Sequence, residues 1–506
     1  MKNTILDYVR ETVKNFPEKQ AVIDERESIS FAELHGRSLG TATAILEKTN
    51  MRKSPILVYL PKSTMSIVAF VGILYSGNFY TPTDVRFPVD KALSVITTVN
   101  PVLIITNEKY ARVLVENGIS QDILLNVDDI EFHHEYKEPP ASKRIIDSDP
   151  AYTFFTSGST GAPKGVTITH LNVIKHLEWY ISTFNVDSKT IIGNQGAFYF
   201  DLSTPDVYSC LFAGATLVII PEKLFAFPAA LLEFLKKNNV NFLYWVPSAY
   251  SNIANLQLLD KVDVSCIKKM LFNGEAMPTK TMNYWMESLD TLELVANLYG
   301  PTEATVACSC YIVDREFEDS EPLPIGFPCA NVELLLFDEN GHLVEESNTL
   351  GEIHIRGTCL SVGYWNDFEK TDNMFIQNPL NPYYHEKIYK TGDLAYYNGR
   401  REMIFAGRKD SQIKHLGYRI ELGEIESAAY AINAISQACS LYDASTKSIY
   451  LFYVSKHYIS EEEIRKRLEK KLPRYMVPVK YIPLEQLPHN ANGKINRLEL
   501  ANKHFK

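Results

Sequence analysis

Residues 152–165, YTFFTSGSTGAPKG, combine the residue types that bind anions. Glycines let backbone N–H groups turn toward an anion, serine and threonine hydroxyls add donors, and Lys164 supplies positive charge. The spacing is not that of a Walker A loop, because GxxxxGK[ST] is absent. We therefore predict a strand followed by a phosphate-binding loop of a different kind.

The elements that would position this loop can be inferred from the apolar pattern. Short apolar runs that alternate with helical patterns lie at 56–60, 102–106, 123–127, 215–221, 241–246 and 268–275. Each run has the length of a buried strand. The alternation predicts α/β layers with mostly parallel sheets.

The chain after about residue 320 has a different pattern. Residues 331–344 are typical of a hairpin with Asn-Gly at its turn, and 351–357 alternate as a strand with one polar face. We expect a smaller, more antiparallel subdomain here. A compact tail in the order helix, strand, strand, helix is expected near 422–433, 438–443, 448–455 and 460–472.

Composition limits the class of protein. The 506 residues are 45% hydrophobic and 22% charged, which can bury a core and excludes general disorder. Acidic residues exceed basic ones, 61 against 51, so a nucleic-acid partner is not expected. The seven cysteines form no CxxC pair, which favours reduced thiols. Without a signal peptide or membrane span, we expect a cytoplasmic protein of two to four structural units.

The phrase TSGSTGAPKG, 156–165, resembles the signature of the adenylate-forming superfamily. This superfamily includes acyl-CoA synthetases, luciferases and the adenylation domains of nonribosomal peptide synthetases. Companion motifs follow in the family's order over nearly the whole chain. They are NLYGPTE (297–303), GEIHIRG (351–357), YKTGD (389–393), GRKD with GYRIE (407–410 and 417–421) and NGK (492–494).

The resemblance implies that a carboxylate attacks the α-phosphate of ATP and that pyrophosphate leaves. The difficulty is to bring two anions together and to stabilise charge at phosphorus. The family assigns this task to Lys494, a mobile point charge that bridges carboxylate and phosphate oxygens. Arg408 and Lys414 are the other residues expected to be catalytic.

The resemblance also implies the ATP site. Tyr299 would stack on adenine, and Asn297 would bond its exocyclic amine. Asp393 would accept the ribose hydroxyls with support from Arg408. A carboxylate beside a triphosphate would be repelled unless it held a cation, so Glu303 is the expected Mg²⁺ ligand. The other residues expected to bind ATP are Thr156, Ser157, Gly158, Ser159, Thr160, Lys164, Thr302 and Lys494.

The implied fold is α/β, with a large N-terminal domain of two α/β sheet subdomains plus a β-rich subdomain, and a small mobile α+β C-terminal domain. We expect 1–409 to form the adenylation core that binds ATP and substrate. We expect 410–506 to form a cap that carries Lys494. Asp410 is the expected hinge, and rotation about it would exchange Lys494 for residues 417–419 before thioester formation.

Asp201 indicates which carboxylate is activated. In amino-acid-activating members an aspartate here pairs with the substrate α-ammonium, and a buried ammonium requires such a partner. The alternative is that Asp201 only caps a helix. Trp245 would shorten the pocket and favour a small side chain. Phe200 is either a gate of the thiol tunnel or a core aromatic. The other expected pocket residues are Leu202, Pro205, Leu271, Asn273, Leu298, Val306 and Ala307.

Three phrases, FDLS (200–203), VPSAY (246–250) and GPTEATVA (300–307), most resemble the D-alanine–D-alanyl carrier protein ligase family. This implies ATP-dependent activation of a small amino acid, with D-alanine favoured. The aminoacyl group would then pass to the phosphopantetheine thiol of a carrier protein. The chain ends soon after Lys494, which leaves no room for a carrier domain, so we expect a separate carrier.

Two departures from that family leave alternatives open. Asn273 stands where the family has a cysteine, and Pro205 stands where it has a longer flexible residue. Asn273 adds hydrogen-bonding capacity that would suit serine, glycine or another small polar amino acid, as in a freestanding nonribosomal-peptide-type adenylation enzyme. An acyl-CoA ligase, a non-amino carboxylate substrate and a catalytically silent binding protein are the further alternatives. The intact set of charged motif residues argues against the last.

Overall fold

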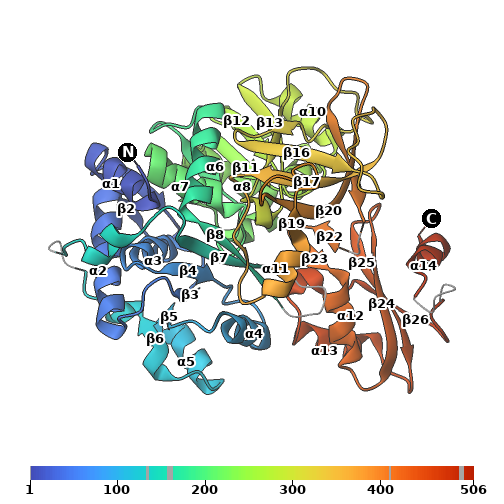
Figure 1. Cartoon of the computed structure of the whole chain (residues 1–506), viewed down its shortest axis with the longest axis horizontal. Coiled ribbons are helices and arrows are strands. Elements are labelled where there is room, and N and C mark those ends of the chain that lie inside the picture. Colours follow the sequence, from blue (N-terminus) through green and yellow to red (C-terminus); the bar gives the residue numbers. More distant parts are fainter. Residues whose placement is uncertain (1, 133–135, 157–162, 410–411, 489–494, 506) are drawn as a thin grey trace. The chain divides into compact units, whose positions relative to one another are not determined.

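The computed structural model describes the chain apart from residues 1, 133–135, 157–162, 410–411, 489–494 and 506 (Figure 1). The described residues divide into two compact units. The first comprises the described parts of Met1–Val85, Val99–Phe155 and Gly165–Lys409. The second comprises the described parts of Arg86–Thr98, Thr156–Lys164 and Asp410–Lys506.

A seven-stranded sheet contains the two strands that flank the predicted phosphate loop. Its order is β18-β8-β7-β4-β3-β5-β6. The run from β7 to β6 is parallel, as the buried apolar pattern predicted, and β18 lies antiparallel to β8. The strands are β3 (Pro55–Tyr59), β4 (Phe79–Pro82), β5 (Leu103–Thr106), β6 (Leu124–Asn126), β7 (Pro150–Thr156), β8 (Lys164–Thr169) and β18 (Gly363–Tyr364).

A nine-stranded sheet supports most of the predicted pocket residues. Its order is β15-β14-β13-β12-β11-β9-β10-β1-β2, and it is parallel from β13 to β1. The outer strands β14, β15 and β2 pair antiparallel. The strands are β1 (Gln20–Ile23), β2 (Ser28–Ser30), β9 (Ile191–Asn194), β10 (Thr216–Ile219), β11 (Phe242–Trp245), β12 (Lys269–Phe272), β13 (Leu294–Tyr299), β14 (Ser309–Ile312) and β15 (Phe327–Pro328).

Helices connect these parallel strands, as βα alternation requires (Figure 1). Helix α3 is apolar on almost every side, and α3 and α7 are both almost fully buried, whereas α2 and α5 bury one face. The helices of the first unit are α1 (Ile5–Asn15), α2 (Phe31–Lys48), α3 (Thr64–Tyr75), α5 (Glu108–Glu116), α6 (His170–Thr183), α7 (Ser203–Ala213), α8 (Pro228–Lys237), α9 (Pro247–Asn255), α10 (Thr279–Ser288) and α11 (Phe368–Met374).

A third sheet forms the β-rich part of the first unit. Its strands are β16 (Val332–Phe337), β17 (Gly351–Gly357), β19 (Phe375–Gln377), β20 (Lys387–Tyr397) and β21 (Met403–Arg408). The predicted hairpin over 331–344 forms, although its return segment is short. Beyond the Asn-Gly turn the Val344 amide donates to the Leu336 carbonyl, and Phe337 and Leu343 make an antiparallel bridge. Strand β16 also pairs along its length with β17.

The second unit contains a three-stranded sheet and a short hairpin. The predicted order of helix, two strands and helix is confirmed by α12 (Leu422–Tyr430), β24 (Ile435–Asp443), β25 (Ser448–Ser455) and α13 (Glu461–Glu469). Helix α13 begins after Ser460, whose hydroxyl accepts from the Glu463 amide, as its sequence predicts. The remaining elements are α4 (Val89–Val99), β22 (Gln412–His415), β23 (Tyr418–Glu421), β26 (Lys480–Pro483) and α14 (Arg497–His504).

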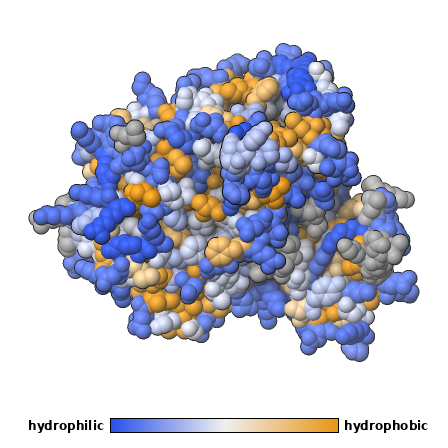
Figure 2. All heavy atoms as spheres, viewed as in Figure 1, coloured by the Kyte–Doolittle hydropathy of each residue, from blue (hydrophilic) through white to orange (hydrophobic). Residues whose placement is uncertain are grey.

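The apolar side chains of the strands are largely buried in the cores of these sheets. On the face shown in Figure 2, hydrophobic residues lie in small groups among hydrophilic ones. Within the described part of the chain, no helix is both long and apolar enough to cross a membrane. None of the seven cysteines, all of them among the described residues, is paired in a disulfide.

Candidate active site

Tyr299, Asp393 and Arg408, which we call the nucleotide group, are brought together although they lie far apart in the sequence. The Tyr299 hydroxyl donates to Oδ2 of Asp393 over 2.6 Å, and the Arg408 guanidinium pairs with Oδ1. Antiparallel pairing of β20 with β21 sets Asp393 opposite Arg408. Each carboxylate oxygen has a second lone pair, so Asp393 can still accept hydroxyl donors.

Burial determines the protonation of Tyr299. The side chain is 3% exposed, and burial, reinforced by the neighbouring Asp393 carboxylate, raises its pKa well above the usual value. Tyr299 therefore stays a neutral donor at physiological pH. Asn297, two residues earlier on β13, donates from its amide to the Pro324 carbonyl over 2.8 Å. This bond orients the amide whose oxygen an exocyclic amine would need as acceptor.

Glu303 is fully buried in a short 3₁₀ turn, Thr302–Ala304. Its Oε1 accepts from the Tyr364 hydroxyl over 2.8 Å, and its backbone carbonyl accepts from the Ser361 amide. Among the described residues no group of three or more His, Cys, Asp or Glu side chains could hold a metal by itself. A single carboxylate nevertheless fits Mg²⁺, which is usually bound by one or two carboxylates together with substrate phosphates and water.

The described ends of the predicted phosphate loop are Thr156 and Lys164. Thr156 ends β7, and its hydroxyl is buried with no hydrogen-bond partner. A buried hydroxyl without a partner is uncommon, and a phosphate oxygen would satisfy it. Lys164 begins β8 and is 7% exposed. The other predicted loop residues, Ser157, Gly158, Ser159 and Thr160, lie outside the described residues.

Only some of the predicted catalytic and hinge residues are among those that the structure describes. Lys494 and Asp410 lie outside the described residues. Lys414 lies on β22 of the second unit, where it pairs with Arg419 of β23. Arg408 belongs to the first unit. The roles of these four residues therefore stay predictions.

Asp201 is held by the turn that precedes α7. The Ser203 amide and hydroxyl both bond the Phe200 carbonyl, and the Thr204 amide bonds the Asp201 carbonyl. The N-cap position of α7 is Leu202, one residue after Asp201. The Asp201 side chain is 8% exposed, so a carboxylate is buried where the sequence predicted the substrate ammonium.

Asn273 follows β12, and its side chain makes three hydrogen bonds. Its amide nitrogen donates to the Tyr244 hydroxyl over 2.9 Å and to the Val306 carbonyl over 3.0 Å. Its oxygen accepts from the Gly274 amide over 2.7 Å. Both N–H donors of Asn273 are therefore used inside the protein. We call Tyr244, Asn273 and Val306 the pocket wall.

The comparisons with known proteins identify the family. The model of the AMP-binding enzymes matches residues 9–365, and the model of their C-terminal domain matches 424–494. The chain belongs to the AMP-binding enzyme family. It is an adenylate-forming ligase, as its motifs predicted.

Curated relatives match this AMP-binding enzyme at about 30% identity. It is 32% identical to a D-alanine–D-alanyl carrier protein ligase of Bacillus cytotoxicus, covering 99% of each chain. It is 30% identical to zwittermicin A synthase ZmaJ of Bacillus cereus, covering 99% of this chain and 95% of that one. Tyrocidine synthase 3 of Brevibacillus parabrevis is 31% identical over 98% of this chain, but the match spans only 8% of that protein.

Solved structures share the fold. The adenylation domain AlmE of Vibrio cholerae, in complex with glycyl-adenosine-5′-phosphate, superposes with a TM-score of 0.85 at 20% identity, covering 99% of this chain and 98% of that one. Holo-PA1221, a protein with adenylation and PCP domains, superposes with a TM-score of 0.84 at 23% identity, covering 99% and 84%. These likenesses confirm the predicted fold class, a mixed α/β protein with a large N-terminal and a smaller C-terminal domain.

Trp245 makes its contacts away from Asn273, and its role in the pocket stays a prediction. Its indole N–H donates to the Gly193 carbonyl over 2.7 Å, and its ring packs against Phe225 and Tyr250. Neighbouring residues of a strand point to opposite faces of the sheet. Tyr244 is thus the β11 residue that shares a face with Asn273, and we add it to the candidate pocket.

The sequence analysis missed Tyr244 and Tyr364. Strand alternation could have found Tyr244, because its register partner Leu271 was already a predicted pocket residue. No sequence signal links Tyr364 to Glu303, since they are joined only by the tertiary fold. Among the other predicted pocket residues, Phe200 is half-buried. The rest are buried, namely Leu202, Pro205, Leu271, Leu298, Val306 and Ala307.

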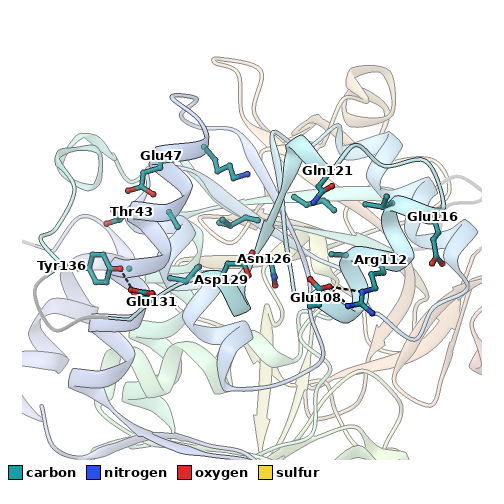
Figure 3. A pocket seen from close by; sticks show the side chains of 18 residues that line it. Thr43, Glu47, Glu108, Arg112, Glu116, Gln121, Asn126, Asp129, Glu131 and Tyr136 are labelled. Atoms are coloured by element: carbon teal, nitrogen blue, oxygen red, sulfur yellow. Dashed lines mark hydrogen bonds and ion pairs between the residues drawn. The ribbon is translucent and has the colours of Figure 1, made fainter.

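A cavity of about 670 Å³ in the first unit is a different feature (Figure 3). It lies between α2, α5 and the segment around β6, and none of the predicted site residues lines it. Arg112, one of its two basic residues, pairs with Glu108. Five carboxylates line this cavity and would repel a triphosphate: Glu47, Glu108, Glu116, Asp129 and Glu131.

Proposed function

We propose that this adenylate-forming ligase joins a small amino acid to AMP, releasing pyrophosphate from ATP. It then transfers the aminoacyl group to the phosphopantetheine thiol of a carrier protein, and AMP leaves. The observation that carries the amino acid is the buried Asp201 carboxylate beside α7. A buried ammonium needs such a partner, whereas a fatty or aryl acid does not.

D-alanine is the favoured amino acid. A relative that this chain matches over 99% of its length is named for that substrate. Asn273 offers a polar side chain no N–H donor, because both of its donors are taken by Tyr244 and Val306. The Tyr244 ring on this wall also favours a small side chain. Serine, glycine or another small amino acid remains the alternative, as does coenzyme A as the acceptor.

The two parts of the chain would divide the work. Residues 1–409 would bind ATP and the amino acid, and 410–506 would supply Lys494 to the α-phosphate, with Asp410 as hinge. Asp393 would accept the ribose hydroxyls while the hydrogen bond from Arg408 orients its carboxylate. Thr156 and Lys164 would contact the β- and γ-phosphates. Mg²⁺, held by Glu303, would neutralise phosphate charge.

The test is amino-acid-dependent exchange of labelled pyrophosphate into ATP, run with D- and L-amino acids, glycine, aryl acids and fatty acids. We expect exchange with D-alanine above all other acids. Asp201→Asn, which keeps the shape but removes the charge, should abolish exchange with amino acids and leave ATP binding intact. Exchange only with non-amino acids would refute the role of Asp201. Mass spectrometry that detects the aminoacyl group on the phosphopantetheine thiol of a carrier protein would establish the second step.

A further inference from the structure

The turn after Glu303 contains two adjacent residues in a conformation that their side chains disfavour. Thr305 has a φ of 51° and Val306 a φ of 72°. Both are β-branched and fully buried, and such residues rarely adopt positive φ. The Ala307 amide bonds the Thr305 carbonyl over 2.9 Å, which makes Val306 the centre of a γ-turn of the rare, strained kind. Strained backbone of this type persists only where its surroundings hold it.

Two side chains hold this turn from opposite ends. Asn273 donates to the Val306 carbonyl, and the Thr305 hydroxyl donates to the Cys359 carbonyl over 2.6 Å. The turn also lies against Gly300, where an added Cβ would come within 2.6 Å of the Ala307 Cα. Glycine at 300 is therefore required for this close approach.

The turn connects two parts of the candidate site. Glu303 lies two residues before Thr305, and the side chains of Val306 and Ala307 follow directly. A relaxation of the γ-turn would move the backbone on both sides of it. The same Asn273 amide holds Tyr244, so one side chain ties the pocket wall to the segment that carries Glu303.

We propose that Asn273 is a positioning residue that clamps the strained turn and thereby sets Glu303 and the pocket wall together. It acts through the Val306 carbonyl and not by contact with the substrate. The inference rests on the proposed function, because Glu303 matters here as the residue for Mg²⁺. The proposal adds that the hydrogen bonds of Asn273 couple the position of the Mg²⁺ ligand to that of the amino-acid pocket.

The substitution Asn273→Asp tests the clamp, because it keeps the shape and removes both donors. We expect the amino-acid KM and the Mg²⁺ concentration for half-maximal pyrophosphate exchange to rise together, each at least threefold. A residue that only lines the pocket would change the KM alone. A residue that only supports the fold would lower the unfolding temperature and change neither. An unchanged Mg²⁺ requirement would overturn the proposal.

A second substitution separates strain from simple loss of a bond. Val306→Gly removes the conformational strain, so in the Asn273→Asp background it should restore the Mg²⁺ requirement to within twofold of the wild-type value. If the Mg²⁺ requirement does not recover, Asn273 does not act by holding the strained turn, and the proposal is overturned. If Asn273→Asp does not fold, Thr305→Val removes the brace to Cys359 alone and must produce the same paired rise.

The inference and the proposed function can fail separately. Urea unfolding of the single and double variants needs no substrate. If Asn273 clamps the strained turn, Asn273→Asp should lower the urea concentration at which half of the protein is unfolded. Adding Val306→Gly to that variant should then recover part of the loss. If the shift in urea midpoint of the double variant equals the sum of the shifts of the two single variants, the clamp is refuted even in an active enzyme. If the wild type exchanges pyrophosphate only with non-amino acids, the Mg²⁺ comparison is made with that acid and the clamp is judged on it.

Discussion

The nucleotide group and the pocket wall are built on different physical principles. Arg408 and Asp393 form a charge-assisted pair, and Tyr299 donates to the same carboxylate. The pocket wall uses neutral groups, the Asn273 amide, the Tyr244 hydroxyl and a strained backbone carbonyl. A bound nucleotide presents hydroxyls and phosphates that need charged partners, whereas a small side chain needs a firm boundary. The first region should therefore respond to loss of charge and the second to loss of shape.

The largest effect is expected for Asp393→Asn. The variant keeps the shape but loses the charge that would bind two ribose hydroxyls, each bond being worth about 2 kcal/mol. The kcat/KM for ATP should therefore fall by roughly a thousandfold. Steady-state kinetics measure this. Tyr299→Phe, which removes one donor and leaves the carboxylate, is the matched control and should lose less than tenfold. A loss below tenfold in Asp393→Asn would remove the ribose assignment.

The neutral character of the pocket side predicts sensitivity to acid. Burial lowers the pKa of His176 from about 6.5 to about 4, although the nearby Ala307 backbone partly offsets this effect. Between these values the unfolded chain binds a proton that the folded chain does not, so stability falls as pH drops from about 6.5 toward 4. His176→Gln should remove about 3 kcal/mol of this pH dependence. Urea unfolding at pH 7 and near pH 4.5 measures the difference. An identical dependence in the variant would mean that His176 is charged in the fold.

Pocket size is the next test of the comparison. Tyr244→Ala opens the wall, so amino acids with larger side chains should gain about tenfold in kcat/KM relative to D-alanine, as expected for a cavity of one or more methylene groups. Tyr244→Phe keeps the ring and serves as the control, with an unchanged order of substrates. Pyrophosphate exchange over a series of D-amino acids gives the profile. The same profile in both variants would exclude Tyr244 as the boundary.

The smallest effect is expected for Trp245→Phe. The ring is largely kept, but the Gly193 carbonyl loses its indole donor, which costs about 1 kcal/mol of unfolding free energy. The substrate profile should stay that of the wild type, because Trp245 lies on the opposite face of β11 from Asn273. Urea unfolding and pyrophosphate exchange check the two parts. A shift toward larger substrates would confirm Trp245 as a pocket residue.

The strained turn shows how the two regions meet. Thr305 and Val306 each cost roughly 1–3 kcal/mol relative to relaxed backbone. Nothing in GPTEATVA signals this cost, since neither residue is glycine or asparagine. The fold supplies the compensating bonds from Asn273 and Cys359, which lie in other parts of the chain.

The sequence by itself determined the family, the α/β class and the order of most elements, because these depend on local patterns and on contiguous motifs. The apolar runs predicted the parallel strands, and the motif phrases named Asp201, Glu303, Asp393 and Arg408 as the residues to examine. Helix α13 followed from its cap and its charge order.

Only the tertiary structure decided which of Tyr244 and Trp245 shares a face with Asn273, and that Asn273 spends its donors on the protein itself. It also decided that β16 pairs along its length with β17, while the return of its own turn adds only a short bridge. These outcomes depend on contacts between distant segments, whose alternatives differ by one residue of register or by one hydrogen bond. Local pattern is almost the same for each alternative, so packing makes the choice.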